Sequence, residues 1–191
     1  MKMKKIFLLL FVFATTFFCS FAQSIKSYAT LSGGYLSIKN CEGVAVRMEY
    51  GKSIKFVGVG LSLGYNTTLP YTNHFGFIVN RGQYFQPGDT IDGMTEAFLG
   101  LHLTADIIRL LAKRDTPHSL KAGIVGGITN LSKVHKTENQ AKYFTRFTNY
   151  FTFTASYEFN IYKSYGIGCF YERNLDYNDA NVYGIMIKHS F

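Results

Sequence analysis

Hydrophobic and polar residues alternate with a period of two along most of this chain, and that alternation is typical of β-strands. In the segment "GVAVRMEY", for example, Val44, Val46 and Met48 fall on one face and Arg47 falls on the other. Seven more segments alternate in this way, although Gly33-Gly34 leaves the facing of the first one ambiguous. The predicted strands cover about residues 25–38, 43–50, 54–66, 95–107, 119–129, 147–161, 165–173 and 181–191.

The connections between these strands differ in length. Short ones are predicted at 51–53, 109–117 and 163–164, and long polar ones at 67–93 and 131–146. A helical turn is expected within 106–115, and a hairpin turn is expected at Asn80-Arg81-Gly82. Short turns at one end and long loops at the other are typical of outer-membrane barrels. The predicted fold class is therefore all-β, an eight-stranded antiparallel up-and-down transmembrane β-barrel.

The second face of each strand indicates which side meets lipid. That face consists mostly of Gly, Ser, Thr and Asn, and only 17% of all residues are charged. A soluble sheet needs many long charged residues on its exposed face. Small residues instead suit the lumen of an eight-stranded barrel, which side chains can just fill. We therefore expect the large apolar residues to face outward and the barrel to be closed, since an open edge would leave unpaired amides in hydrocarbon.

Isolated charged residues of both signs fall on the inward face. A lysine or arginine on the lipid face near mid-bilayer would cost about 2 to 4 kcal/mol, which favours an inward position. We expect these side chains to form a salt-bridged polar network that plugs the lumen; the alternative is a set of separately hydrated charges in a narrow pore. The predicted network comprises Arg47, Glu49, Glu96, His102, Asp106, Lys121, Glu158, Glu172 and Lys188.

The first residues have the organisation of a secretory signal peptide. Three lysines precede an apolar run over residues 6–14, and Ser20-Phe21-Ala22 matches the small-x-small pattern of a cleavage site. We predict a signal peptide over residues 1–22, removed on export, followed by a single outer-membrane β-barrel domain over residues 23–191. An uncleaved anchor helix is the alternative, and the apolar run is short for one. Cys41 and Cys169 remain and are expected to be free thiols.

The final segment "NVYGIMIKHSF" places alternating apolar residues before a terminal aromatic residue. It resembles the C-terminal signature strand of bacterial outer-membrane proteins, with Tyr183, Ile185, Ile187 and Phe191 as the assembly signal. The resemblance implies two partners during biogenesis, the barrel-assembly machinery and periplasmic chaperones. The lumen charges resemble those of small OmpA/OmpX-type barrels, and the abundance of Phe and Tyr resembles the Bacteroidetes-type outer-membrane β-barrel group. These resemblances imply a bacterial outer-membrane location, among its lipids and lipopolysaccharide.

No motif indicates catalysis, so a non-enzymatic protein without cofactors is expected. A lipid A or phospholipid hydrolase, the main alternative, would carry a His-x-Ser pair on one face. The pairs His118-Ser119 and His189-Ser190 are adjacent instead, which sends their side chains to opposite faces. His102 and Asp106 share a face but lie too far apart along a strand to bond directly. Without the three signal lysines the net charge falls from +8 to +5. A nucleic-acid binder of this size would usually be more basic, so that class is not indicated.

The long loops are the remaining candidates for function, in a structural or surface-interaction role. The segment 131–146 is basic and suits lipopolysaccharide phosphates or acidic glycans. A narrow pore and a soluble periplasmic β-barrel binding protein are the further alternatives. The possible loop contacts are Phe77, Arg81, Tyr84, Lys133, Lys136 and Lys142.

Overall fold

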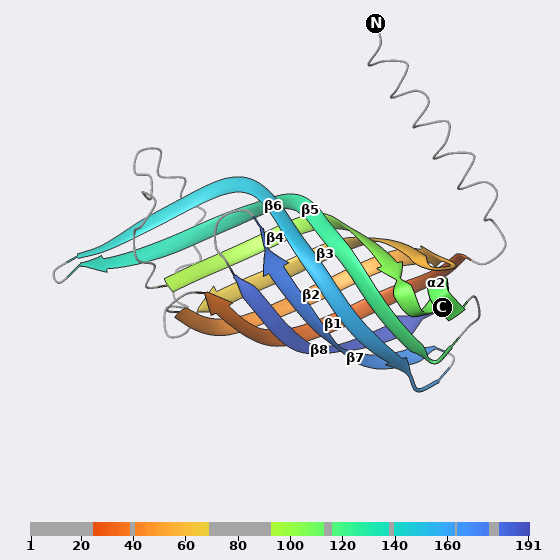
Figure 1. The fold of residues 1–191 in the computed structure, drawn as a ribbon. Helices are drawn as coiled ribbons and strands as arrows, with labels where there is room; N and C mark the ends of the chain where they lie inside the picture. The colour runs from red at the N-terminus through yellow and green to blue at the C-terminus, as the bar shows by residue number, and fades with distance from the viewer. Residues whose placement is uncertain are drawn as a thin grey trace, which may run out of the picture.

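The computed structural model describes residues 25–38, 41–68, 93–112, 116–137, 140–162, 164–175 and 180–191. Within these ranges, eight antiparallel strands close into one barrel in which the first strand pairs with the last (Figure 1). The strands are β1 (Ile25–Ile38), β2 (Cys41–Ile54), β3 (Val57–Thr68), β4 (Gly93–Asp106), β5 (His118–Thr137), β6 (Gln140–Asn160), β7 (Tyr165–Asn174) and β8 (Asn181–Ser190). The predicted fold class is confirmed.

One short helix, α2 (Ile107–Ala112), follows β4 and lies at the same end of the barrel as the C-terminus (Figure 1). We call this end the α2 end. The helical turn predicted within 106–115 is therefore confirmed. No helix in the described ranges is long and apolar enough to cross a bilayer. The signal peptide predicted over residues 1–22 and the hairpin turn predicted at 80–82 lie outside the described residues.

The first short connection lies later in the chain than predicted. The β2 strand runs on to Ile54, which pairs with Val57, so the turn consists of Lys55 and Phe56 rather than residues 51–53. Lys55 adopts the left-handed conformation that a two-residue hairpin turn requires, with φ of 53°. Gly51 is a packing position, since a Cβ there would lie 2.6 Å from the carbonyl oxygen of Val59.

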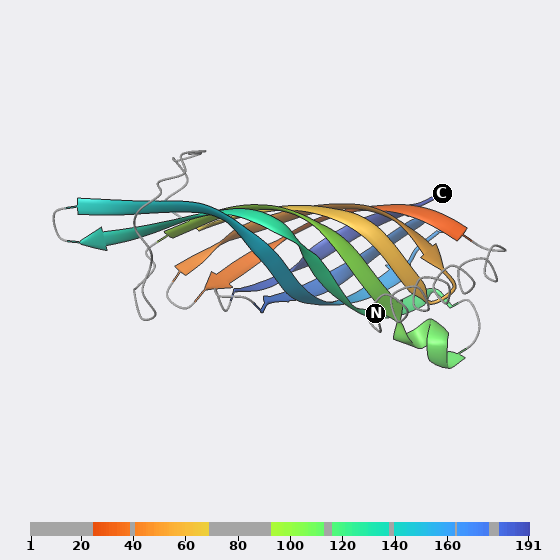
Figure 2. The same ribbon diagram turned by 90° about the horizontal axis from the view of Figure 1, so that it is seen from above.

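The second predicted long loop, 131–146, is a continuation of β5 and β6. Cross-strand pairing continues from the barrel to Thr137 and Gln140, and the hairpin extends beyond the other strands (Figure 2). The hydroxyls of Ser132 and Thr145 are hydrogen-bonded across it at 2.6 Å. Ser132 and Thr145, which the sequence placed in a polar loop, are therefore a cross-strand pair. We call this end of the barrel the hairpin end.

Large apolar side chains cover the outside of the barrel. Leu61, Leu101 and Ile185 are 49%, 61% and 75% exposed, whereas Arg47 and Glu158 on the opposite parity are 4% and 3% exposed. The prediction that apolar residues face outward and charged ones inward is confirmed. The described strands form one closed sheet rather than two packed sheets. The ambiguous facing of β1 is also resolved, since its even-numbered residues are the more buried ones.

Glycines on the inward face make room for aromatic rings. Phe98 of β4 lies over Gly64 of β3, where a Cβ would come within 2.1 Å of the ring. The same ring stacks on Tyr150 of β6 with centroids 4.0 Å apart. The ring therefore cannot move aside without losing its stacking partner, and Gly64 is required for the packing of the interior.

We expect Gly64→Val to destabilise the barrel by about 1 to 3 kcal/mol, the usual range for overpacking a filled interior. Gly33→Val is the matched control, because a Cβ at Gly33 meets only the carbonyl oxygen of Ala45, at 3.9 Å. Urea unfolding of both variants in detergent micelles measures the difference. Equal stability of the two variants would contradict the close packing of Phe98.

Candidate functional site

The barrel interior holds an ion pair between β2 and β7. Nε of Arg47 donates a hydrogen bond to Oε2 of Glu172 over 2.9 Å, and both side chains are buried. The guanidinium also lies 4.8 Å from the centroid of the Phe98 ring. Charge-assisted hydrogen bonds of this kind are strong in a poorly hydrated environment, so the pair ties two distant strands together.

Glu96 of β4 lies on the same inward face and is held by neutral donors. Nδ2 of Asn66 donates to one carboxylate oxygen over 2.8 Å, and Oγ1 of Thr129 donates to the other over 3.2 Å. These two partners come from β3 and β5, the strands on either side of β4. The carboxylate therefore bridges three neighbouring strands from the inside.

A second charged cluster centres on Glu158 of β6. One of its carboxylate oxygens accepts a short hydrogen bond from Nζ of Lys121, and the other accepts from Nζ of Lys188 over 2.9 Å. Both ammonium groups also lie over the ring of Tyr28, at 5.6 and 5.1 Å from its centroid. One carboxylate and one aromatic face thus balance two cations inside the barrel.

Tyr28 connects this cluster to a histidine pair. Its hydroxyl donates to Oε1 of Glu49 over 2.5 Å, and Oε2 of Glu49 lies 2.9 Å from Nδ1 of His102. The other ring nitrogen of His102 lies 2.8 Å from Oγ1 of Thr154. Both ring nitrogens and both carboxylate oxygens therefore have partners, which fixes the imidazole in place.

Asp106 is the inward-facing acidic residue at the α2 end. It accepts a hydrogen bond from the backbone N–H of Arg109 over 3.1 Å and one from Oγ of Ser119 over 2.6 Å. It therefore caps the N-terminus of α2, as aspartate commonly does. The guanidinium of Arg109 lies 3.3 Å from the same carboxylate. Asp106 belongs to this capping group and has its own partners, separate from those of His102.

All nine predicted network residues lie on the inward parity. They form four groups, because Tyr28 joins the Glu158 cluster to the Glu49–His102 pair, while the Arg47–Glu172 pair, Glu96 and Asp106 each have separate partners. Residues that the sequence reading left out complete these groups. Tyr28 lies on the strand whose facing was ambiguous, and Arg109 lies in a segment read as a connector. The inward parity could have identified the uncharged partners of Glu96, whereas no sequence signal pointed to Arg109. The full set of missed partners is Tyr28, Asn66, Arg109, Ser119, Thr129 and Thr154.

The adjacent His-Ser pairs are split between two faces, as the sequence indicated. Ser119 points inward to Asp106, whereas Nδ1 of His118 lies 2.6 Å from the hydroxyl of Tyr157 on the exposed side. His189 packs against the ring of Tyr165 with centroids 4.6 Å apart. Neither of these two pairs therefore brings its imidazole to its own serine hydroxyl, the contact that activates a serine nucleophile.

Cys41 and Cys169 form no disulfide in the described part of the chain, in agreement with the prediction of unbridged thiols. Cys41 is the first residue of β2, and Cys169 is exposed on the outer face of β7. Across the described part of the chain, no group of three or more His, Cys, Asp and Glu side chains is placed to hold a metal ion.

The predicted loop contacts have different outcomes. Phe77, Arg81 and Tyr84 lie outside the described residues. Lys133 and Lys136 belong to β5 and Lys142 belongs to β6, so these lysines lie on a β-hairpin rather than on an irregular loop. Cross-strand pairing between β5 and β6 continues through this segment up to Thr137 and Gln140.

Aromatic rings gather at both ends of the outer surface. At the α2 end, Phe191 lies 6.1 Å from Tyr50 and 5.5 Å from His189, between ring centroids. Toward the hairpin end, Tyr171 and Tyr183 lie 5.1 Å apart. Rings with one polar edge favour the boundary between hydrocarbon and water, so this arrangement matches two interfacial belts.

The predicted C-terminal signal lies on the strand that closes the barrel. Phe191 exchanges backbone hydrogen bonds with Ser27 of β1, at 2.9 and 3.0 Å. Its four residues all face outward and are more than half exposed: Tyr183, Ile185, Ile187 and Phe191.

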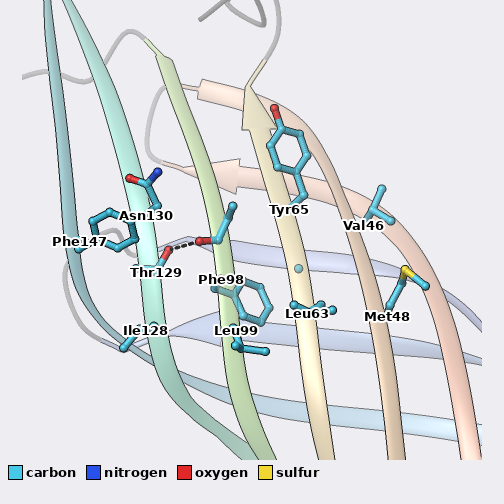
Figure 3. A pocket seen from close by; sticks show the side chains of 12 residues that line it. Val46, Met48, Leu63, Tyr65, Phe98, Leu99, Ile128, Thr129, Asn130 and Phe147 are labelled. Carbon is cyan, nitrogen blue, oxygen red and sulfur yellow. Dashed lines mark hydrogen bonds between the residues drawn. The ribbon is translucent and has the colours of Figure 1, made fainter. Parts of the chain in front are cut away.

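The outer surface also carries an apolar groove of about 430 Å³ over β2 to β6 (Figure 3). Ala97 lies in register between Tyr65 and Asn130, and Asn130 pairs with Phe147. Because Ala97 has only a methyl group, the surface is hollowed between the larger side chains around it. Leu63, Leu99 and Ile128 form the next row toward the α2 end. We call this feature the Ala97 groove.

Comparison with known proteins relates this chain to others through its fold. No family model matches the sequence, and no curated protein matches it. The structure is similar to Neisserial surface protein A, with a TM-score of 0.52 and 10% identity over 87% of this chain and 97% of that chain. That similarity shows a shared fold.

Two other solved structures have lower scores. The N-terminal β-barrel domain of Pseudomonas aeruginosa OprF has a TM-score of 0.47 and 9% identity, over 87% of this chain and 97% of that chain. Ail, the attachment invasion locus protein of Yersinia pestis, has a TM-score of 0.46 and 15% identity, over 87% of this chain and 98% of that chain.

Proposed function

We propose that this chain is a non-enzymatic integral protein of the bacterial outer membrane, with a plugged lumen and a structural or surface-interaction role. One observation carries the proposal: large apolar side chains are exposed on the outside of the closed barrel, while the ion pairs are buried inside it. Water solvates such an exterior poorly, and hydrocarbon solvates it well. The hairpin that extends beyond the barrel supplies surface for contacts outside the membrane.

The contacts of the inward side chains support the proposed plugged lumen. Arg47, Glu158 and Lys188 are buried, and each is engaged in an ion pair. An eight-stranded barrel is just wide enough for such side chains to fill it. The non-enzymatic role is supported by the split His-Ser pairs and by the fixed imidazole of His102, whose ring nitrogens both have partners.

The proposed partners follow from this location. Outer-membrane lipids and lipopolysaccharide would surround the apolar exterior and its aromatic belts. The barrel-assembly machinery and periplasmic chaperones would act on the chain during biogenesis, and the outward apolar face of β8 suits recognition by an assembly factor. The chemistry of a surface ligand stays open in this proposal.

Fractionation and electrophoresis test the location. We expect the protein in the outer-membrane fraction, and we expect its unboiled form to migrate faster than its boiled form, because a closed barrel resists detergent until it is heated. Release by osmotic shock without detergent would contradict the membrane location and favour a soluble periplasmic barrel.

Conductance tests the plug separately. In planar bilayers, we expect wild-type protein to give no single-channel current above background, because ion pairs occupy the lumen. A stable ion current from folded protein would contradict the plugged lumen and favour a narrow pore. The membrane location would stand in that case, so the two parts of the proposal are separable.

A further inference from the structure

The short helix α2 has an apolar face that the barrel does not cover. Ile107, Leu110 and Leu111 are 37%, 47% and 76% exposed, and no residue of α2 is buried. Because residues i, i+3 and i+4 lie on one side of an α-helix, these three side chains form one surface, which we call the α2 face. Water solvates such a surface poorly, so an apolar environment is favoured there.

The side chain of Arg109 determines how α2 is rotated about its own axis. Its guanidinium lies 3.3 Å from the buried carboxylate of Asp106, and it lines a small polar cavity at the mouth of the lumen together with Lys188. Ile107 and Leu111 each lie two residues from Arg109, which places them about 200° away around the helix. With Arg109 directed toward the lumen, the α2 face is directed away from it.

The α2 face continues the outer surface of the barrel. The outward residues of β4 end with Leu103 and Ala105, and Ile107 follows them in the same alternation. Figure 2 shows α2 projecting to one side of the barrel instead of across its opening. The helix contacts β5, whose first residue, His118, lies 5.2 Å from Phe159 between ring centroids. The α2 face is therefore level with aromatic rings of the outer surface at this end of the barrel.

The connection between β6 and β7, also at the α2 end, exposes apolar side chains as well. Ile161 continues the outward row of β6 beyond Phe159, and both Ile161 and Tyr162 are more than half exposed. Backbone N–H groups of these two residues donate hydrogen bonds to the carbonyl oxygen of Tyr165, which holds the turn in place. Two connections thus extend the apolar exterior past the strand ends, and a membrane interface accommodates such side chains better than water does.

Lipid fits the α2 face better than a protein partner does. A stable protein–protein interface takes about 20 to 30 residues a side, whereas the α2 face offers three large side chains. A helix that spans hydrocarbon needs about 20 residues, and α2 has six. A short apolar face beside a lipid-facing surface instead matches a helix in the plane of the interface, with that face about 5 to 10 Å into the headgroup–acyl boundary.

We propose that α2 is an interfacial helix that inserts Ile107, Leu110 and Leu111 into the phospholipid leaflet at the α2 end of the barrel. This inference rests on the proposed membrane location and adds to it a lipid contact outside the strands. Because the proposed function places the hairpin outside the cell, the leaflet concerned is the periplasmic one. The polar side of α2, held by Asp106 and Arg109, stays at the mouth of the lumen.

Fluorescence tests the proposal, because the chain contains no tryptophan and a single introduced one reports its own surroundings. The emission of Leu111→Trp is measured in the folded barrel, in phosphatidylcholine vesicles that contain no other protein. We expect blue-shifted emission, and stronger quenching by phosphatidylcholine brominated near the headgroup than by the same lipid brominated near the chain ends. Leu110→Trp, on the same face, gives an independent measurement and should behave in the same way.

Two further variants calibrate the result. Ala112→Trp is the matched control, because Ala112 is exposed but lies three residues from Arg109, on the polar side of the same helix. Its emission should be red-shifted and weakly quenched. Leu101→Trp lies midway along β4 on the outer face, so bromines near the chain ends should quench it more strongly than bromines near the headgroup.

The outcomes separate this inference from the proposed function. Each variant is first shown to be folded by its heat-modifiable migration. If no brominated lipid quenches Leu101→Trp, the proposed membrane location is wrong, and the α2 proposal fails with it. If Leu101→Trp is quenched while Leu110→Trp and Leu111→Trp emit in the same way as Ala112→Trp, the α2 proposal alone is wrong, and a partner outside the membrane is favoured.

Discussion

Glu158→Gln is expected to destabilise the barrel by about 3 to 5 kcal/mol, because breaking a buried ion pair leaves uncompensated charge behind. The carboxylate of Glu158 is the shared partner of Lys121 and Lys188, and its side chain is 3% exposed. Glutamine retains the shape but leaves two ammonium groups close together in a poorly hydrated interior. Urea unfolding in phospholipid vesicles, followed by circular dichroism, measures the loss.

Two further variants determine whether charge is the cause. Adding Lys188→Met to Glu158→Gln removes one of the two unbalanced cations and should restore a large part of the lost stability. Glu42→Gln, at an exposed position of β2, should change the free energy of unfolding by no more than about 0.5 kcal/mol. If Glu158→Gln is as mild as Glu42→Gln, the lumen charges are hydrated separately and the interior is a wet pore.

Which residues of each strand point inward could be predicted, because side chains alternate between the two faces with the same period of two in every strand. Every second residue points inward, so charged residues as far apart as Arg47 and Lys188 follow a single parity rule. A lysine or arginine that broke this rule near mid-bilayer would be penalised by the lipid. The same rule identified the outward row of β8 from Tyr183 to Phe191.

The partners of these charges could not be predicted, because parity does not specify register or distance around the barrel. Arg47 and Glu172 are 125 residues apart in sequence. Their contact depends on closure between β1 and β8, which no local pattern specifies. The inward face of β1 also could not be assigned, because Gly33 and Gly34 have no side chains and interrupt the alternation. Tyr28 was missed for that reason.

Turn and loop boundaries failed where composition was taken as a guide to structure. Gly51 was read as a turn residue, but its missing side chain serves the close approach of Val59 and the hydroxyl of Tyr28. Ser132 and Thr145 were predicted to lie in a loop, yet threonine is common in strands, and the two residues pair across β5 and β6. The Ala97 groove had no sequence signal at all, since it depends on which side chains flank a small residue on neighbouring strands.

Leu101→Arg is expected to destabilise the barrel folded in a bilayer by about 2 to 4 kcal/mol. This is the cost of an arginine on the lipid face near the midplane. Leu101 lies midway along β4 and is 61% exposed. In a water-soluble protein, a charge at so exposed a position would change stability by about 0.5 kcal/mol or less. The size of the effect therefore reports which solvent contacts the outer face.

Ile25→Arg provides the matched control, because Ile25 is 51% exposed but lies at the first position of β1, at the α2 end. Near a membrane interface, arginine costs only about 0 to 1 kcal/mol, so this variant should remain close to wild type. Reversible urea unfolding from vesicles compares the two. A large penalty at Leu101 with a small one at Ile25 places hydrocarbon around the middle of the barrel. Equal and small penalties would place water there, and the proposed membrane location would be wrong.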